Sequence, residues 1–512
     1  MKLNSNVLVN VYEQKTSHLL ASDLFFIDNQ TSYLSYGKQI ADLIKPFLEK
    51  KITFDVKIRV RTNDGHDYMH ELSSFNKGSG VVVLDESPLD TTKVIFNNRE
   101  TAPFVWLEFI DPSVGKHGSN KWYSLKACEC NYALIDATYA RHGAVPGANF
   151  AQHAVKPYQY PAYMYYIKLY EKIAKGYKDY TKERIDTNAV VQKTDTINGN
   201  TDFGIKDSQV AGLVTMLTQL ANETLENNYS IKRDQVNAVA VKKARKLLVS
   251  MAKIKTVKCF NKKLLELFHI IPRKMDTVSS YMADNKDDFG QILQDENDLL
   301  DILENQINAE QKVSGEGFLN KLGLEIYAAT PSQVGYIKSK LPQDLQDKVV
   351  HIYRVINNKT QERFDAYLKS HNYPAVKQFW HGSRNANWWN IICAGLLLHS
   401  GAPTTGKMFG DGIYFAPSPK KSWGYTSASG SYWAHGNSGT AFMGLFATAH
   451  DNPVDVYTHS LEYYSYAAKI FETKHPGHDC LFCHRGSMLR NDEVVLYREE
   501  QTTINFIVEF KA

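Results

Sequence analysis

The spacing of apolar residues changes twice along the chain, and this change constrains the fold more than any other feature of the sequence. Up to about residue 180, and again from about residue 318, apolar and polar side chains alternate, as Phe54 and Val56 do in the segment FDVKIRV. Between residues 206 and 312 the apolar side chains recur at every third or fourth position instead. Alternation is the period of a half-buried strand, and the longer spacing is that of an amphipathic helix. The sequence therefore predicts a multidomain α+β chain with an all-helical region in its middle.

Length and composition fit several packed domains. The chain has 512 residues, of which 43% are hydrophobic and 22% charged. Domains usually hold about 100–200 residues, so a single small fold is excluded. The same composition excludes a collagen-like or globally disordered chain. The net charge of +4 is too small to identify a polyanionic partner.

Shifts in pattern place four domains and one linker. The polar stretch KERIDTNAVVQKTDTINGN has no sustained period and predicts a connection rather than an element. In chain order the expected parts are an unassigned α+β domain at 1–102, a small β-sheet domain with one helix at 103–185, a linker at 186–205, a helical bundle at 206–315, and a β-rich domain at 318–512.

The sequence also indicates where the protein works. No apolar run approaches the ~18 residues that a membrane-spanning helix needs, and polar residues interrupt the first 14 positions, MKLNSNVLVNVYEQ, so no secretory signal is expected. Six widely spread cysteines suit a reducing compartment. We therefore expect no membrane association and an intracellular protein, nuclear in a eukaryote and cytoplasmic in a bacterium or virus.

In the last domain, polar and aromatic residues stand at the ends of expected strands, where rigid elements hold functional groups best. His381 and Gly382 end one strand, Tyr414 follows a Gly-x-Gly turn, and Glu493 begins another strand. A glycine at a strand end lets a ligand approach the main chain closely. Each fragment by itself is also typical of an ordinary turn or a solvated strand edge.

Together these fragments carry a resemblance. The segments VVHIYRVINNKTQERFDAY, WHGSR, MFGDGIYFA, KKSWGY and LRNDEVVLY follow one another between residues 349 and 497. In this order they resemble the catalytic domain of the poly(ADP-ribose) polymerases, which belong to the diphtheria-toxin-like ADP-ribosyltransferase superfamily. The resemblance covers residues 318–512 and implies an enzyme that takes NAD+ as its substrate.

The resemblance assigns residues to the nicotinamide end of NAD+. It implies that the Gly382 backbone holds the carboxamide, that the Ser422 hydroxyl assists, and that Tyr425 stacks on the ring. Ser383 and Asn387 are implied as further NAD+-binding residues.

The family's His-Tyr-Glu triad is complete here as His381, Tyr414 and Glu493. By resemblance, His381 binds the adenosine ribose, Tyr414 packs beside the nicotinamide, and Glu493 holds the 2′-hydroxyl of the nicotinamide ribose. Cleavage of the nicotinamide bond develops positive charge on that ribose, so a carboxylate beside it stabilises the transition state more than the ground state. Glu493 at this position is similar to the members that elongate polymers.

Two upstream regions are also similar to parts of this family. The helical region, with LFHIIPRKM and ENDLLDILENQI, looks like the regulatory helical domain that obstructs NAD+ access at rest. Residues 103–185 resemble the WGR domain, although its signature stands here only as Tyr139, Ala140 and Arg141. Arg141 keeps a guanidinium suited to a DNA phosphate. The alternative is an ordinary surface arginine on a small sheet.

A group of histidines and cysteines precedes Glu493. The stretch HPGHDCLFCHRG combines a Cys-x2-Cys spacing with nearby histidines, and its members are His475, His478, Cys480, Cys483 and His484. This spacing is common among zinc ligands. The tankyrase branch of the family carries a zinc motif elsewhere in the domain, so a loop without metal is the favoured interpretation and no metal ligand is assigned.

The sequence therefore predicts a poly(ADP-ribosyl)transferase that DNA breaks activate and that modifies proteins, including itself, with release of nicotinamide. Two alternatives stay open. One is a transferase that attaches single ADP-ribose units, and the other is a DNA-end-binding scaffold with weak or absent catalysis. The products formed from labelled NAD+ with and without nicked DNA distinguish the three.

Overall fold

A computed structural model describes the chain except residues 1–4, 64, 66, 76–79, 84–95, 97, 149–153, 185–202, 231–235, 311–316, 399–407 and 429–437. The chain forms two compact units. Unit 1 comprises residues 1–186 and 268–282, and unit 2 comprises residues 187–267 and 283–512. Among the described helices, none is both long and apolar enough to cross a membrane.

The N-terminal part of unit 1 is an antiparallel sheet with one helix. Its strand order is β2-β1-β3-β4-β5. The elements are β1 (Ser5–Glu13), β2 (Leu19–Ile27), α1 (Tyr33–Glu49), β3 (Phe54–Thr62), β4 (Asp67–Phe75) and β5 (Gly80–Val83). Ser32 caps α1 by accepting a hydrogen bond from the Ser35 N–H. Ile40 and Ile44 of α1, one turn apart, are fully buried against the sheet.

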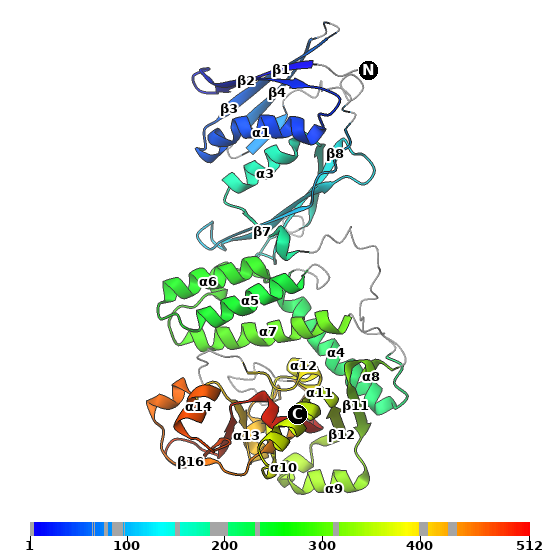
Figure 1. The fold of residues 1–512 in the computed structure, drawn as a ribbon, viewed down its shortest axis with the longest axis vertical. Helices are drawn as coiled ribbons and strands as arrows, with labels where there is room; N and C mark the ends of the chain where they lie inside the picture. The colour runs from blue at the N-terminus through cyan, green and yellow to red at the C-terminus, as the bar shows by residue number, and fades with distance from the viewer. Residues whose placement is uncertain are drawn as a thin grey trace. The chain divides into compact units, whose positions relative to one another are not determined.

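A second antiparallel sheet follows, with strand order β10-β6-β7-β8-β9. Its elements are β6 (Val105–Asp111), β7 (Ser119–Ala127), β8 (Leu134–Arg141), β9 (Lys156–Pro161), α3 (Met164–Ala174), β10 (Lys178–Asp179) and the short helix η1 (Thr181–Glu183). Helices α1 and α3 lie against each other in unit 1 (Figure 1). A side chain at Gly37 of α1 would meet the Tyr163 carbonyl oxygen at 1.8 Å, so this approach requires glycine.

The two sheets of unit 1 share one hydrophobic core. Val9 of β1, Ile40 of α1, Ile167 of α3 and Ile135 of β8 all belong to the same buried cluster and are fully buried. The residues expected to form an unassigned domain and those expected to form a small β-sheet domain are thus packed together through the two helices.

Unit 1 also includes a segment from the expected helical region, residues 268–282. The Arg184 guanidinium, which is buried, donates hydrogen bonds to the carbonyl oxygens of Ile270 at 2.8 Å and His269 at 3.1 Å. It also pairs with the buried Glu108 carboxylate at 3.0 Å. Charge-assisted hydrogen bonds therefore tie this segment to the second sheet.

Unit 2 begins with the helices. They are α4 (Ser208–Asn228), α5 (Ala238–Met251), α6 (Val257–Ile270) and α7 (Asp288–Glu310). The Asp207 side chain caps α4 by accepting from the backbone N–H groups of Gln209 and Val210. The rings of Phe260 on α6 and Phe289 on α7 stack with centroids 3.9 Å apart. Helices α4 and α7 also contact α12 of the domain that follows.

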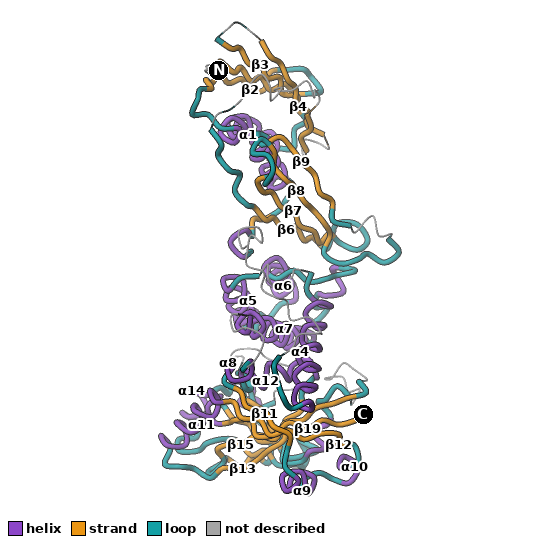
Figure 2. The backbone as a smooth tube through the Cα atoms, turned by 90° about the vertical axis from the view of Figure 1, so that its right-hand side faces the viewer, coloured by secondary structure: helices purple, strands orange, loops and turns teal. Residues whose placement is uncertain are grey.

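The C-terminal domain contains two sheets, of order β11-β12-β19-β15-β13 and β14-β18-β17-β16. Figure 2 shows the strands of the first sheet gathered as orange tubes. The strands are β11 (Leu324–Ala328), β12 (Val349–Asn357), β13 (Val376–Gly382), β14 (Ile413–Phe415), β15 (Thr440–Ala449), β16 (Val454–Val456), β17 (Leu481–Cys483), β18 (Glu493–Leu496) and β19 (Thr502–Lys511). The helices are α8 (Phe318–Leu322), α9 (Pro331–Ser339), α10 (Gln343–Gln346), α11 (Asn358–Ser370), α12 (Trp388–Ala394), α13 (Pro419–Trp423) and α14 (Ala468–Lys474).

Candidate active site

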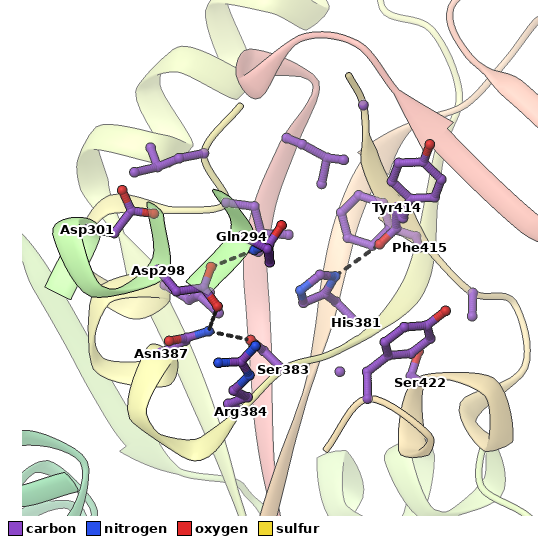
Figure 3. A pocket seen from close by; sticks show the side chains of 18 of the residues that line it. Gln294, Asp298, Asp301, His381, Ser383, Arg384, Asn387, Tyr414, Phe415 and Ser422 are labelled. Carbon is purple, nitrogen blue, oxygen red and sulfur yellow. Dashed lines mark hydrogen bonds between the residues drawn. The ribbon is translucent and has the colours of Figure 1, made fainter. Parts of the chain in front are cut away.

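A cavity of about 290 Å³ in unit 2 collects most of the residues expected to carry chemistry (Figure 3). Its walls come from the end of β13, from β14, from α13, from the first residue of β18 and from α7. The expected site residues that line it are His381, Gly382, Ser383, Asn387, Tyr414, Ser422, Tyr425 and Glu493. Segments separated by more than a hundred residues in the sequence thus meet at one site.

Gly382, the last residue of β13, is fixed by a close backbone contact. A Cβ atom there would lie 1.9 Å from the Ser422 carbonyl oxygen, far inside van der Waals contact. Only glycine fits, and the main chain of Gly382 is therefore exposed to the cavity without a side chain in front of it. Ser422 is 3% exposed and lines the same wall.

The His381 ring has a defined orientation. Its Nδ1 lies 3.0 Å from the Tyr414 carbonyl oxygen, which can only accept, so Nδ1 carries the proton of this bond. Burial lowers the pKa of His381 below its usual value. The neutral ring then leaves Nε2 as an acceptor for a hydroxyl group, as a ribose would supply.

Tyr414 lines the cavity, and its hydroxyl is bonded to the main chain of the preceding turn. Its hydroxyl donates to the Gly410 carbonyl oxygen at 3.0 Å and accepts from the Phe409 N–H at 3.0 Å. Burial raises the pKa of Tyr414 well above its usual value. The hydroxyl is therefore engaged in holding the preceding turn, and the ring is what faces the cavity (Figure 3).

Glu493 opens β18 and is 7% exposed. Its carboxylate forms an ion pair with the Lys421 ammonium, and both side chains are nearly buried. Lys421 stands on α13 directly before Ser422, in the segment KKSWGY. The sequence did not single out this lysine, because only the serine and tyrosine of that segment carried the resemblance. A nearly buried carboxylate loses much of its hydration, and an ion pair with an ammonium offsets part of that loss.

Helix α7 supplies a wall of the cavity that the sequence did not predict residue by residue. Gln291, Gln294, Asp298 and Asp301 of α7 line the cavity. Burial raises the pKa of Asp298. Asp298 and Asp301 thus place two carboxyl groups at a site expected to receive the diphosphate of NAD+. Ionised carboxyl groups there would repel the diphosphate, because like charges repel.

Two polar contacts fasten α7 to the residues after β13. The Arg384 guanidinium pairs with the Asp295 carboxylate at 2.6 Å. The Asn387 amide donates to Asp298 at 3.1 Å and to the Ser383 hydroxyl at 3.2 Å. Ser383 and Asn387, both expected to bind NAD+, are thus linked to each other and to α7 (Figure 3).

Arg141, the expected DNA contact, lies in unit 1 with its guanidinium engaged. It donates hydrogen bonds to the carbonyl oxygens of Gly118 at 2.9 Å, His117 at 3.4 Å and Asp276 at 3.4 Å. Burial lowers the pKa of Arg141 below its usual value. The geometry shows Arg141 joining β8 to the segment 268–282.

The histidines and cysteines before Glu493 bind separate partners. Cys480 and Cys483 are fully buried, and burial raises the pKa of both thiols. His475 contacts the Tyr466 hydroxyl at 2.9 Å, and His484 pairs with Asp455 at 2.7 Å. Among the described residues, no three histidine, cysteine or acidic side chains are grouped as metal ligands.

Comparison with known proteins agrees with this geometry. Residues 333–446 match the poly(ADP-ribose) polymerase catalytic domain. Poly [ADP-ribose] polymerase 2-A of Oryza sativa subsp. japonica is 34% identical over 110 residues, which are 21% of this chain and 16% of the relative. Poly [ADP-ribose] polymerase 2 of Zea mays is 40% identical over 82 residues, or 16% of this chain and 12% of the relative.

Poly [ADP-ribose] polymerase 1 of Gallus gallus is 40% identical over 83 residues, which are 16% of this chain and 8% of the relative. The matched segments thus span between 8% and 16% of these relatives' own length. The family match falls on the strands and helices from α9 to β15, and these include His381, Gly382, Tyr414 and Ser422 of the cavity. This part of the chain is therefore similar to the catalytic domain of the poly(ADP-ribose) polymerases.

Proposed function

We propose that the protein cleaves NAD+ and transfers its ADP-ribose to protein acceptors, itself included. The observation that carries this proposal is the convergence of His381, Gly382, Tyr414 and Glu493 on one cavity. These residues come from β13, β14 and β18, and rigid strands hold functional groups in fixed positions.

The cavity offers what the nicotinamide end of NAD+ requires. Gly382, where no side chain fits, and Ser422 line the same cavity. Tyr425 lines the cavity and is 41% exposed, so a face of its ring is accessible for stacking. These groups would bind the carboxamide and the ring of nicotinamide. The Nε2 acceptor of His381 would bind a ribose hydroxyl.

The Glu493 carboxylate is the group that acts on the reacting bond. As the bond between ribose and nicotinamide breaks, positive charge develops on the ribose, and a carboxylate close to the 2′-hydroxyl stabilises it. The Lys421 ammonium pairs with this carboxylate and fixes its orientation. Nicotinamide leaves with the electron pair of its bond to the ribose. The acceptor nucleophile then forms its bond to the same ribose carbon and passes its proton to the Glu493 carboxylate, from which solvent removes it.

We propose further that the product is a polymer and that DNA breaks activate its synthesis. The polymer is supported by the glutamate at position 493, which can polarise the hydroxyl of a bound ADP-ribose unit, and by the names of the relatives. Activation is supported by α7, which occupies one wall of the cavity and is tied to it through the Arg384 and Asp295 ion pair. If NAD+ binds only when α7 has moved away, the apparent affinity of the protein for NAD+ is proportional to the population of that state.

Incubation of the full chain with labelled NAD+, with and without nicked duplex DNA, tests both parts. Long polymer formed only with DNA supports the whole proposal. Single ADP-ribose units would support the mono-transferase instead, and DNA binding without nicotinamide release would support the scaffold.

A further inference from the structure

Two cysteines lie side by side in the connection between β7 and β8 of unit 1. Cys128 directly follows the last residue of β7, and Cys130 stands two residues later. Both are free thiols, and their Sγ atoms form a hydrogen bond of 3.0 Å. Cys128 is 6% exposed, whereas Cys130 is open to solvent. A small reagent can therefore reach one thiol of the pair, while the other lies in contact behind it.

The backbone of this connection holds the two sulfur atoms within bonding reach. A disulfide joins residues whose Cα atoms are about 4.4–6.8 Å apart. Residues two apart in sequence are separated by at most about 7.6 Å, and the bend of the chain at residues 129 and 130 shortens this distance. The Cys128 N–H donates to the Leu134 carbonyl oxygen at 3.3 Å, and the Leu134 N–H donates to that of Asn131 at 3.0 Å. These main-chain bonds fix the connection.

The surroundings of the pair distinguish its two members. The Gln159 amide donates to the Cys128 sulfur at 3.7 Å, and a donor at this position favours a thiolate. The hydrogen bond with Cys128 raises the pKa of the Cys130 thiol. Cys130 is therefore protonated near neutral pH, and loss of this proton must precede any attack by its sulfur.

The remaining cysteines offer a natural comparison. Cys259 is exposed like Cys130, but it stands on α6 in unit 2. Cys480 and Cys483 are fully buried. Exposure and a neighbouring thiol thus occur together at Cys130, whereas Cys259 is exposed in a different unit from the pair.

We propose that Cys128 and Cys130 form a redox-active dithiol, which small disulfides such as oxidised glutathione convert to an intramolecular disulfide. This inference does not depend on the proposed function. The new bond closes a loop of three residues, and so short a loop removes little entropy from the unfolded chain. The bond therefore adds little stability, and small thiols can reverse it by exchange. The pair is a reversible modification site rather than a structural crosslink.

The reaction balances as two successive exchanges. The Cys130 thiol loses its proton to solvent, and its sulfur attacks the small disulfide, which breaks and releases one thiolate. Cys128 then loses its proton and attacks the Cys130 sulfur of the mixed disulfide, and the second small thiolate leaves. The two protein thiols are oxidised by two electrons. The small disulfide is reduced to two thiols, which take up the two protons.

The bond would fix a connection that contacts both sheets of unit 1. The ring of Tyr132, in this connection, lies 6.2 Å from that of Tyr33, the first residue of α1. The Ala133 carbonyl oxygen accepts from the Ala162 N–H, just before α3, at 2.7 Å. We therefore expect the amides of residues 128–134 to exchange hydrogen more slowly in the oxidised protein than in the reduced protein.

The test incubates the full chain with mixtures of oxidised and reduced glutathione, blocks the remaining thiols with N-ethylmaleimide, and digests the protein with trypsin. Cleavage after Lys126 and Arg141 gives one peptide, residues 127–141, that holds both cysteines. We expect this peptide to lose two hydrogen atoms, to take up no maleimide, and to regain both thiols with dithiothreitol. A peptide alkylated at both cysteines, or one that carries glutathione, would overturn the proposal.

A synthetic peptide of residues 126–134 is the matched control for the fold, because it has the same spacing without the fixed backbone. We expect the protein to be half closed at a ratio of oxidised to reduced glutathione about tenfold lower than the peptide requires, since the folded chain holds the sulfur atoms together. Equal ratios would show that the fold does not prepare the pair, and would also overturn the proposal.

Substitutions separate the two roles. Cys128→Ser removes the second thiol, so Cys130 should keep one glutathione. Cys259 should also keep one glutathione in every digest, which shows within the same sample that the oxidant was active. Cys259→Ser should leave closure of the pair unchanged. If Cys128→Ser carries no glutathione at Cys130 while Cys259 does, Cys130 is not the attacking thiol and the proposed reaction is wrong.

Discussion

The catalytic cavity of unit 2 and the tyrosine row of unit 1, formed by Tyr139, Tyr158 and Tyr160, are built in opposite ways. The cavity takes its groups from strand ends and from glycine-containing turns, and it buries them: Glu493 is 7% exposed and Ser422 is 3% exposed. The tyrosine row lies on β8 and the edge strand β9, and its central residue, Tyr158, is 44% exposed. Buried groups act through fixed electrostatics, whereas exposed rings act through contact area. Substitutions should therefore have large effects in the cavity and graded effects at the edge.

The largest effect is expected from Glu493→Gln. The amide keeps the shape of the side chain and loses the charge that stabilises the ribose in the transition state. We expect nicotinamide release to fall by about a hundredfold or more, which is the usual loss when one electrostatic stabiliser is removed. NAD+ binding, measured by calorimetry, should stay within a few-fold. Long polymer made by this variant would contradict the role of Glu493.

Lys421 should act through Glu493, as a positioning residue. Replacing Lys421 by Met removes the ammonium and leaves the nearly buried Glu493 carboxylate without its charged partner. We expect nicotinamide release to fall by about tenfold or more, because the carboxylate is no longer held in position. Lys421→Arg, which restores the charge, should keep most of the activity. Equal losses in Lys421→Met and Lys421→Arg would contradict the positioning role.

The contact between α7 and the cavity should restrain activity. Asp295→Ala removes the ion pair with Arg384, which is partly exposed, and such pairs contribute little to stability. We expect activity without DNA to rise by about two- to fivefold, because the state with α7 displaced becomes more populated. DNA should then stimulate the variant less than the wild type. Replacement of Asp301 is not a suitable control, because it pairs with Arg245. Asp287→Ala, at the exposed start of the helix, is suitable.

The comparison also explains what the sequence could predict. His381, Tyr414 and Glu493 lie in short motifs whose local pattern is readable, and the strands that carry them were expected from alternation. Lys421 was missed because its importance depends on Glu493, which is 72 residues away in the chain. The sequence predicted that the α7 region is helical, but no local pattern indicates which of its carboxyl groups line the cavity.

The tyrosine row was harder still to predict. Tyr139 belongs to β8, whereas Tyr158 and Tyr160 belong to β9, and only the register of β8 against β9 aligns their rings. Strands β16 and β17 have three residues each, too few to show alternation, and were not predicted. Periodicity is a property of one segment, whereas pairing is a property of two.

The shared core of unit 1 has a consequence for how the protein melts. Buried residues of helices α1 and α3 and of both sheets belong to one hydrophobic cluster. Neither half of residues 5–184 can lose its packing without exposing the apolar surface of the other. The two sheets should therefore unfold in one cooperative calorimetric transition, with a heat capacity change that corresponds to both sheets together.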